Sequence, residues 1–184
     1  MGPGEMRGAY DQRVTGTARV TRASLGTLSP LIAPVPMTQL PQRVWSQWQW
    51  DLIRRGYLAR DMDEKWDVFV EDHVAFLHRS WTGNGIFEAT FSPAADGGWR
   101  ISGAAVGASR ARAVSADLNQ VLLELVLCAI VLGEPAAGLR AELVRLSVPP
   151  DCPAPPARAI EHSVLGLRSD QQRPLPPKDT SHPG

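Results

Sequence analysis

Hydrophobic and polar positions follow two different periods along the chain, and the first of them is helical. Between residues 41 and 57, tryptophan and aliphatic side chains recur every three or four positions, as on the apolar face of an amphipathic helix. Trp45, Trp48 and Leu52 define that face, and Gly56 is a suitable end. We therefore predict an N-terminal helix. Its three tryptophans, Trp50 included, cannot all lie on one face, so we expect at least one to pack against something other than the core face of the helix.

The segment that follows has a period of two, which is typical of half-buried strands. Strong β-formers occur in four runs, KWDVFVED, VAFLHRSW, GIFEATF and WRISGAAV, which begin at Lys65, Val74, Gly85 and Trp99. Short turn sequences such as Asn84–Gly85 separate the runs. Connections of this kind favour a four-stranded antiparallel meander.

The most apolar stretch of the chain predicts a buried helix. VLLELVLCAIVL, residues 121–132, is apolar nearly all round, with Ser115 as a suitable N-cap and Gly133 as a suitable end. It is too short to span a bilayer and carries Glu124. We expect it to lie across the sheet, where its large side chains contribute roughly 1.5–3 kcal/mol each and outweigh any single polar contact.

These elements define one domain between two irregular ends. Residues 1–36 are rich in Gly, Arg, Thr, Ser and Pro without a sustained period, so we expect a disordered N-terminal extension, and Met37 is a candidate native start. Residues 37–148 should form a single α+β domain: the N-terminal helix, the four-stranded meander, and the long apolar helix packed on the sheet. Residues 149–184 are expected to be a Pro-rich flexible tail, in which RPLPP (173–177) is either a docking peptide or plain solvated chain.

Composition narrows the classes of partner. The chain of 184 residues carries 19 basic and 19 acidic side chains, so no net charge draws it toward nucleic acid or an anionic membrane. The N-terminus lacks the apolar stretch of a secretory signal, and the richness in arginine, alanine and proline is typical of a GC-rich bacterial genome. Cys128 and Cys152 have no metal-ligand spacing. We expect a cytoplasmic protein with reduced thiols, no metal and no cofactor.

The segment HRSWTGNG, residues 78–85, concentrates hydrogen-bond donors where a predicted strand meets a turn. A guanidinium presents two parallel donors to an oxyanion, and glycines let successive backbone amides form a concave nest around one. Arg110 and Arg112 precede the Ser115 cap, and helix N-termini attract anions. The predicted ligand-binding residues are Arg79, Ser80, Trp81, Thr82, Gly83, Arg110 and Arg112.

The alternative is a turn with a purely structural role. Strand alternation places Arg79 among apolar residues, so its guanidinium must reach an edge of the sheet, stack on an aromatic ring such as Trp81, or bind a carboxylate. In a purely structural turn the partner would be a carboxylate such as Glu71 or Glu88. His78 and Asp117 are the candidates for proton transfer in a catalytic site, but a histidine beside acids in a sheet is also commonly structural. No nucleophile elbow or metal motif accompanies them.

The stretch KWDVFVEDHVAFLHRSWTGNGIFEATF resembles a group of small uncharacterised bacterial proteins in which an aromatic-flanked RSWTG follows a Lys–Trp strand. The resemblance covers about residues 66–133. It implies an association with ADP-ribose metabolism but assigns no catalytic residue. Asn84–Gly85–Ile86–Phe87 follows the motif where that group has bulkier aromatics, which puts a shared pocket in doubt.

Three functions are compatible with these residues. The first is a non-catalytic module that binds an anionic, phosphate- or nucleotide-like small molecule or a partner protein through the RSWTG turn. The second is an enzyme acting on a nucleotide-derived substrate, ADP-ribose included, in which Arg79 clamps phosphate and His78 or Asp117 transfers protons. The third is a structural homodimer, joined through the apolar helix and tryptophans over about 1,600 Å².

Overall fold

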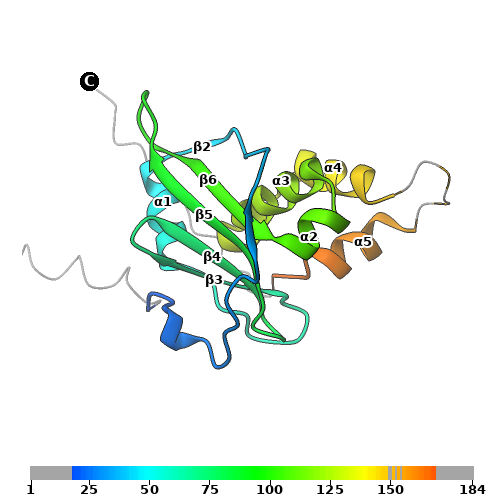
Figure 1. Ribbon diagram of the computed structural model, residues 1–184, viewed down its shortest axis with the longest axis horizontal. Helices are drawn as coiled ribbons and strands as arrows, with labels where there is room; N and C mark the ends of the chain where they lie inside the picture. Colours follow the sequence, from blue (N-terminus) through cyan, green and yellow to red (C-terminus); the bar gives the residue numbers. More distant parts are fainter. Residues whose placement is uncertain (1–17, 149–150, 152, 154, 169–184) are drawn as a thin grey trace, which may run out of the picture.

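A six-stranded antiparallel sheet forms the centre of the structure, a computed structural model that describes residues 18–148, 151, 153 and 155–168. The strands are β1 (Pro34–Pro36), β2 (Val44–Trp45), β3 (Trp66–Glu71), β4 (Val74–Arg79), β5 (Gly85–Pro93) and β6 (Trp99–Gly107). Their order is β1-β6-β5-β4-β3, and β2 also pairs with β6 (Figure 1). The predicted α+β class is confirmed, and the predicted meander corresponds to β3–β6.

One helix lies between β2 and β3, and the others follow β6. They are α1 (Gln47–Arg55), α2 (Ala108–Ala113), α3 (Ala116–Leu125), the π-helix η2 (Val126–Val131), α4 (Ala137–Ser147) and α5 (Ala157–Val164). Figure 1 shows α3, α4 and α5 gathered at one side of the sheet. A single 3-10 turn, η1 (Arg22–Ser24), precedes β1.

The buried helix was predicted correctly, although its second half is π-helical. Residues 125–127 of α3 and η2 are fully buried and join the core cluster that contains Trp66, Val68 and Leu77 of the sheet. The widened turns are visible in the bond from the Leu132 amide to the Leu127 carbonyl. Leu143 of α4 and Leu165 after α5 belong to the same core, so helices of this chain pack beside α3.

The N-terminal helix begins later than the periodicity predicted. Ser46 accepts a hydrogen bond from the Gln49 amide, and the Gln49 side chain returns one from the Ser46 amide, which starts α1 at Gln47. Trp45 therefore lies on β2, fully buried, with its ring 5.4 Å from that of Phe91. The face of α1 that enters the core carries Trp50 and Ile53, whereas Trp48 is only half-buried.

The domain extends beyond both predicted boundaries. Within the stretch expected to be disordered, β1 pairs with the edge of β6, a position where its two prolines remove no needed donor. Earlier residues pack on the outer face of the sheet, where Arg22 forms a two-bond ion pair with Glu71 and lies over Phe69 and Phe76. Beyond the predicted C-terminal boundary, α5 forms within the segment expected to be a flexible tail. Residues 1–17 and 169–184 of the expected ends lie outside the described part of the chain.

The side of α1 that enters the core determines which of its tryptophans matters more for stability, and the sequence periodicity alone would have favoured Trp48. Trp50 is fully buried, with its ring 4.5 Å from Phe91 and 4.7 Å from Trp99, so Trp50→Ala should lower the free energy of unfolding by about 3–5 kcal/mol. The matched variant Trp48→Ala removes a half-buried ring and should cost clearly less. Urea unfolding of both variants tests this; a larger loss for Trp48→Ala would mean that α1 is rotated differently.

Candidate functional site

Two arginines meet at the end of the sheet where β4 and β6 finish. Because β5 runs antiparallel between these strands, their carboxyl ends lie at the same edge. Arg79 is the last residue of β4, and Arg110 lies in α2, which begins directly after β6. Both residues are half-buried. This edge therefore carries two cations from segments that are far apart in the sequence.

Arg79 is held by an aromatic ring and a helix end. Its guanidinium carbon lies 4.4 Å from the ring centroid of Trp66, and Nη1 donates to the carbonyl of Val164 at 2.9 Å. The indole of Trp66 donates to the same carbonyl at 3.1 Å. Val164 is the last residue of α5, where the helix dipole favours a cation. Burial nevertheless lowers the pKa of Arg79 from its ordinary value.

Arg110 has a similar setting on the neighbouring ring. Its guanidinium carbon lies 5.4 Å from the ring centroid of Phe87, which stacks with Trp66 at 6.4 Å. Nε donates to the side-chain oxygen of Asn119 at 2.7 Å. Burial, and then the positive charge of Arg79, lower the pKa of Arg110 to about 10. Arg110 is thus still charged at neutral pH, and the positive charge of Arg79 acts on it.

Among the described residues, neither arginine forms an ion pair with a carboxylate. The predicted alternative for Arg79 does not hold for Glu71, since that side chain binds Arg22. Other arginines of the chain do have acids, as in Arg22–Glu71, Arg43–Glu134, Arg140–Glu161 and Arg145–Glu142. In the described part of the chain no hydrogen bond uses Nη2 of Arg79 or either Nη of Arg110, and these nitrogens reach solvent. They are donors available to a ligand.

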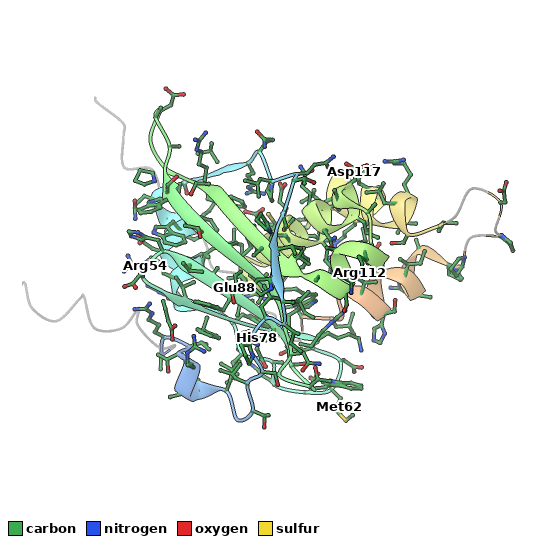
Figure 2. All side chains as sticks on the ribbon, in the orientation of Figure 1. Arg54, Met62, His78, Glu88, Arg112 and Asp117 are labelled. Carbon is green, nitrogen blue, oxygen red and sulfur yellow. The ribbon has the colours of Figure 1, made fainter. Side chains whose placement is uncertain are left out.

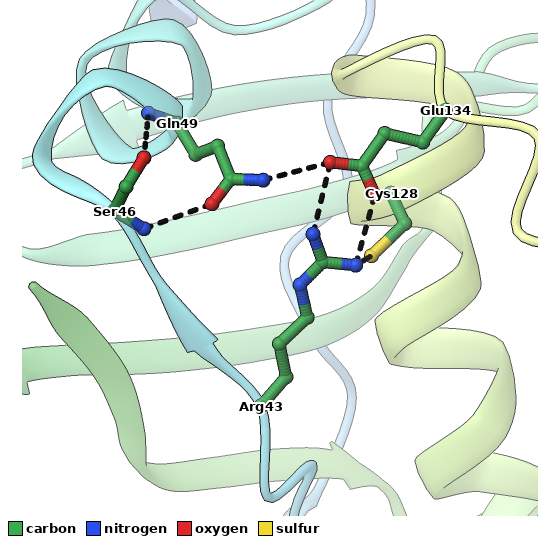
Figure 3. A network of polar contacts seen from close by, with 5 residues as sticks. All are labelled: Arg43, Ser46, Gln49, Cys128 and Glu134. Atoms are coloured by element: carbon green, nitrogen blue, oxygen red, sulfur yellow. Dashed lines mark hydrogen bonds and ion pairs between the residues drawn. The ribbon is translucent and has the colours of Figure 1, made fainter.

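The Arg43 cluster shows what a compensated arginine looks like in this protein (Figure 3). Its Nη2 donates to Glu134 at 2.9 Å and its Nη1 to the sulfur of Cys128 at 3.0 Å. Gln49 donates to the same carboxylate at 2.8 Å, which ties α1 to the end of η2. Burial raises the pKa of the Cys128 thiol to about 12, so the thiol stays protonated and unreactive. This cluster has a structural role.

Three of the five backbone amides of the RSWTG turn are used within the protein. The Arg79 amide donates to Asn84 at 2.9 Å, the Ser80 amide to Lys65 at 3.2 Å, and the Gly83 amide back to Arg79 at 2.8 Å. The hydroxyl of Ser80 donates to the carbonyl of Glu64. The amides of Arg79, Ser80 and Gly83 are therefore not available for the expected anion nest.

The glycines of the turn allow the chain's own N-terminal segment to approach. Ser29 forms a bridge with Asn84 and exchanges backbone hydrogen bonds with the residues on either side of it. Gly83 has a φ of 68°, and a Cβ there would collide with the carbonyl oxygen of Thr27. The close packing that suggested a phosphate is thus made by the segment predicted to be disordered.

Figure 2 labels three of the remaining predicted residues, His78, Arg112 and Asp117. His78 is 4% exposed on the opposite face of β4, where Nδ1 lies 2.9 Å from the Gly83 carbonyl and the ring stacks on Phe69. Arg112 and Asp117 are exposed on the helical side of the molecule. The side chains of Trp81 and Thr82 are exposed at the turn, and the Thr82 hydroxyl accepts from the Asn84 amide at 3.3 Å.

Asn119 is part of the site although no sequence pattern indicated it. It is 3% exposed, accepts from Arg110, and donates to the Val114 carbonyl. It also lines a cavity of about 130 Å³ between residues 36–39, α2 and the start of α3. No pattern in the sequence distinguishes Asn119, because α3 also carries the polar residues Asp117, Gln120 and Glu124.

No group of three or more His, Cys, Asp and Glu residues suited to a metal occurs in the described residues. Nor does that part of the chain contain a helix long and apolar enough to cross a membrane. No protein-family model, curated protein or solved structure matches this chain. The chemistry of the arginine pair is therefore the basis for a functional proposal.

The role of Gly83 in docking the N-terminal segment can be tested by substitution. Gly83→Ala places a Cβ in the left-handed region, at about 1–2 kcal/mol, and adds the collision with Thr27, so a total loss above about 2 kcal/mol is expected. Gly26→Ala is the matched control, because its Cβ would meet nothing. Urea unfolding gives both values, and equal losses would contradict this role.

Proposed function

We propose that this protein is a non-catalytic binding module that holds an anionic, phosphate- or nucleotide-like small molecule between Arg79 and Arg110. The observation that carries the proposal is the pair of half-buried guanidinium groups without a carboxylate among the described residues. A shared anion would neutralise the repulsion between them and satisfy their free donors.

The aromatic support favours binding because it prepares the site in advance. Trp66 and Phe87 are both fully buried and stacked, and each carries one guanidinium on its ring. A planar guanidinium stacked on a ring loses fewer conformations when it binds than a free side chain does. Asn119 and the Val164 carbonyl each hold one further nitrogen in place. The site is thus organised before a ligand arrives.

Two observations favour a binding role over the other two functions considered. Of the candidates for proton transfer, His78 is buried on the opposite face of the sheet, and Asp117 is exposed and forms no hydrogen bond or ion pair with either arginine in the described part of the chain. An enzymatic step would need such a group at the bound anion. The apolar helix packs within the chain against the sheet and α4, so its burial does not require a second subunit.

The test is calorimetric titration of the full chain with inorganic phosphate, pyrophosphate and AMP. Arg79→Ala and Arg110→Ala should each weaken anion binding about tenfold or more, because a charge-assisted hydrogen bond contributes about 1.5–3 kcal/mol. The control is Arg112→Ala, which removes an exposed charge near Arg110 and should leave the affinity within about twofold. Adenosine, which has no anionic group, should bind to none of the proteins through this site.

Thermal unfolding provides the second readout. A saturating anion should raise the melting temperature of the wild-type protein and of Arg112→Ala, because it binds only the folded state. The shift should disappear in Arg79→Ala and Arg110→Ala. Binding that survives both substitutions, or that Arg112→Ala weakens as much, would overturn the proposal.

A further inference from the structure

Three large apolar side chains are exposed around the RSWTG turn. Met62 is 69% exposed, Trp81 60% and Leu167 53%. Single exposed apolar residues are ordinary on a protein surface, but a group of them indicates a contact surface. These three come from the loop before β3, the turn after β4 and the chain after α5.

Lys65 brings the three segments into one patch. Its ammonium lies 4.7 Å from the ring centroid of Trp81, and its stem packs against Gly166, where a Cβ would lie 2.7 Å from the Lys65 Cγ. The Leu167 amide donates to the carbonyl of Asp63 at 2.9 Å, next to Met62. One lysine side chain thus spans the distance between Trp81 and the neighbour of Leu167. We call Met62, Trp81 and Leu167 the Trp81 patch.

The chain itself continues from this patch into its proline-rich end. Leu167 belongs to the patch, and RPLPP begins at Arg173, five residues after Arg168. Five extended residues span up to about 17 Å, enough to reach across a patch that one lysine bridges. A short connection also gives the segment an effective concentration in the millimolar range, so even a weak contact would be occupied.

The chemistry of the segment suits the patch. Prolines have a fixed φ and lose little conformational entropy on binding, and exposed aromatic rings are the usual surface for extended proline-rich chains. Leu175 supplies an aliphatic side chain for Met62 and Leu167. The carboxylate of Asp63, which is exposed and lies 3.6 Å from Nε2 of His162, would offer a counter-charge to Arg173.

We propose that residues 173–177 bind the Trp81 patch of the same molecule, with proline rings on the indole of Trp81. This contact does not depend on the anion site, since none of the three patch residues holds Arg79 or Arg110. The proposal therefore stands or falls separately from the proposed function.

The experiment compares two-dimensional ¹H–¹⁵N NMR spectra of the full chain with those of a variant in which Pro174, Pro176 and Pro177 are replaced by Ala. Trp81→Phe identifies the Trp81 indole signal. The triple substitution should shift that signal and the Leu167 amide, whereas Pro183→Ala, in the same tail but outside the segment, should shift neither. The shifts should be unchanged on tenfold dilution, as expected for an intramolecular contact.

A synthetic peptide of residues 171–179, added to the triple variant, should return both signals toward their wild-type positions. Superimposable spectra of the wild type and the triple variant would overturn the proposal. A difference that fades on dilution would also overturn it, because the occupant would then be the tail of a second copy. A peptide that leaves the Trp81 indole signal in place would show that the segment has no affinity for this patch.

Discussion

Burial of the long helix α3–η2 against the inner face of the sheet determines where the other groups of this protein can lie. The helix takes up the apolar centre of that face, with Leu122, Leu123 and Leu125 fully buried. At the edge where β4 and β6 end, the inner face carries Arg79 on Trp66 and Arg110 on Phe87. Aromatic rings accept a guanidinium without a carboxylate, so this edge holds positive charge that the described part of the protein does not neutralise. Packing of α3–η2 against the sheet therefore forms the core and also leaves the two arginines at its edge.

The elements with strong periodicity were predictable, and those set by local contacts were not. Alternation over many residues identified β3–β6, and the continuous apolar run identified α3–η2. β1 and β2 are two or three residues long, too short for any period, and exist because the edge of β6 offers partners. The start of α1 depends on the reciprocal hydrogen bonds of Ser46 and Gln49. The helix therefore begins after the point at which the helical pattern of the sequence begins. The periodicity of hydrophobic residues indicates which positions are buried, but it does not indicate where capping hydrogen bonds begin a helix.

Arg79 and Arg110 were among the predicted ligand-binding residues, but the surroundings expected for them differ from those in the structure. Glycines and hydroxyls suggested an anion nest, yet Gly83 serves the approach of Thr27, and Ser80 binds a carbonyl. Arg79 and Arg110 do come together, because antiparallel pairing brings the ends of β4 and β6 to one edge. Asn119 and the Val164 carbonyl could not have been inferred, since their roles arise only from the packing of α3 and α5. Contacts between elements that are far apart in the sequence determine which polar groups remain available to a ligand.

The most direct test of the central claim is a double-mutant cycle between Arg79 and Arg110 by urea unfolding, with methionine at each position. In Hepes without phosphate, repulsion predicts that the double variant is destabilised more than the sum of the two single variants, by about 0.5 kcal/mol or more. With saturating phosphate the coupling should change sign, because the anion joins the two guanidinium groups and each then needs the other. A coupling near zero, or one of the same sign in both buffers, would contradict the account.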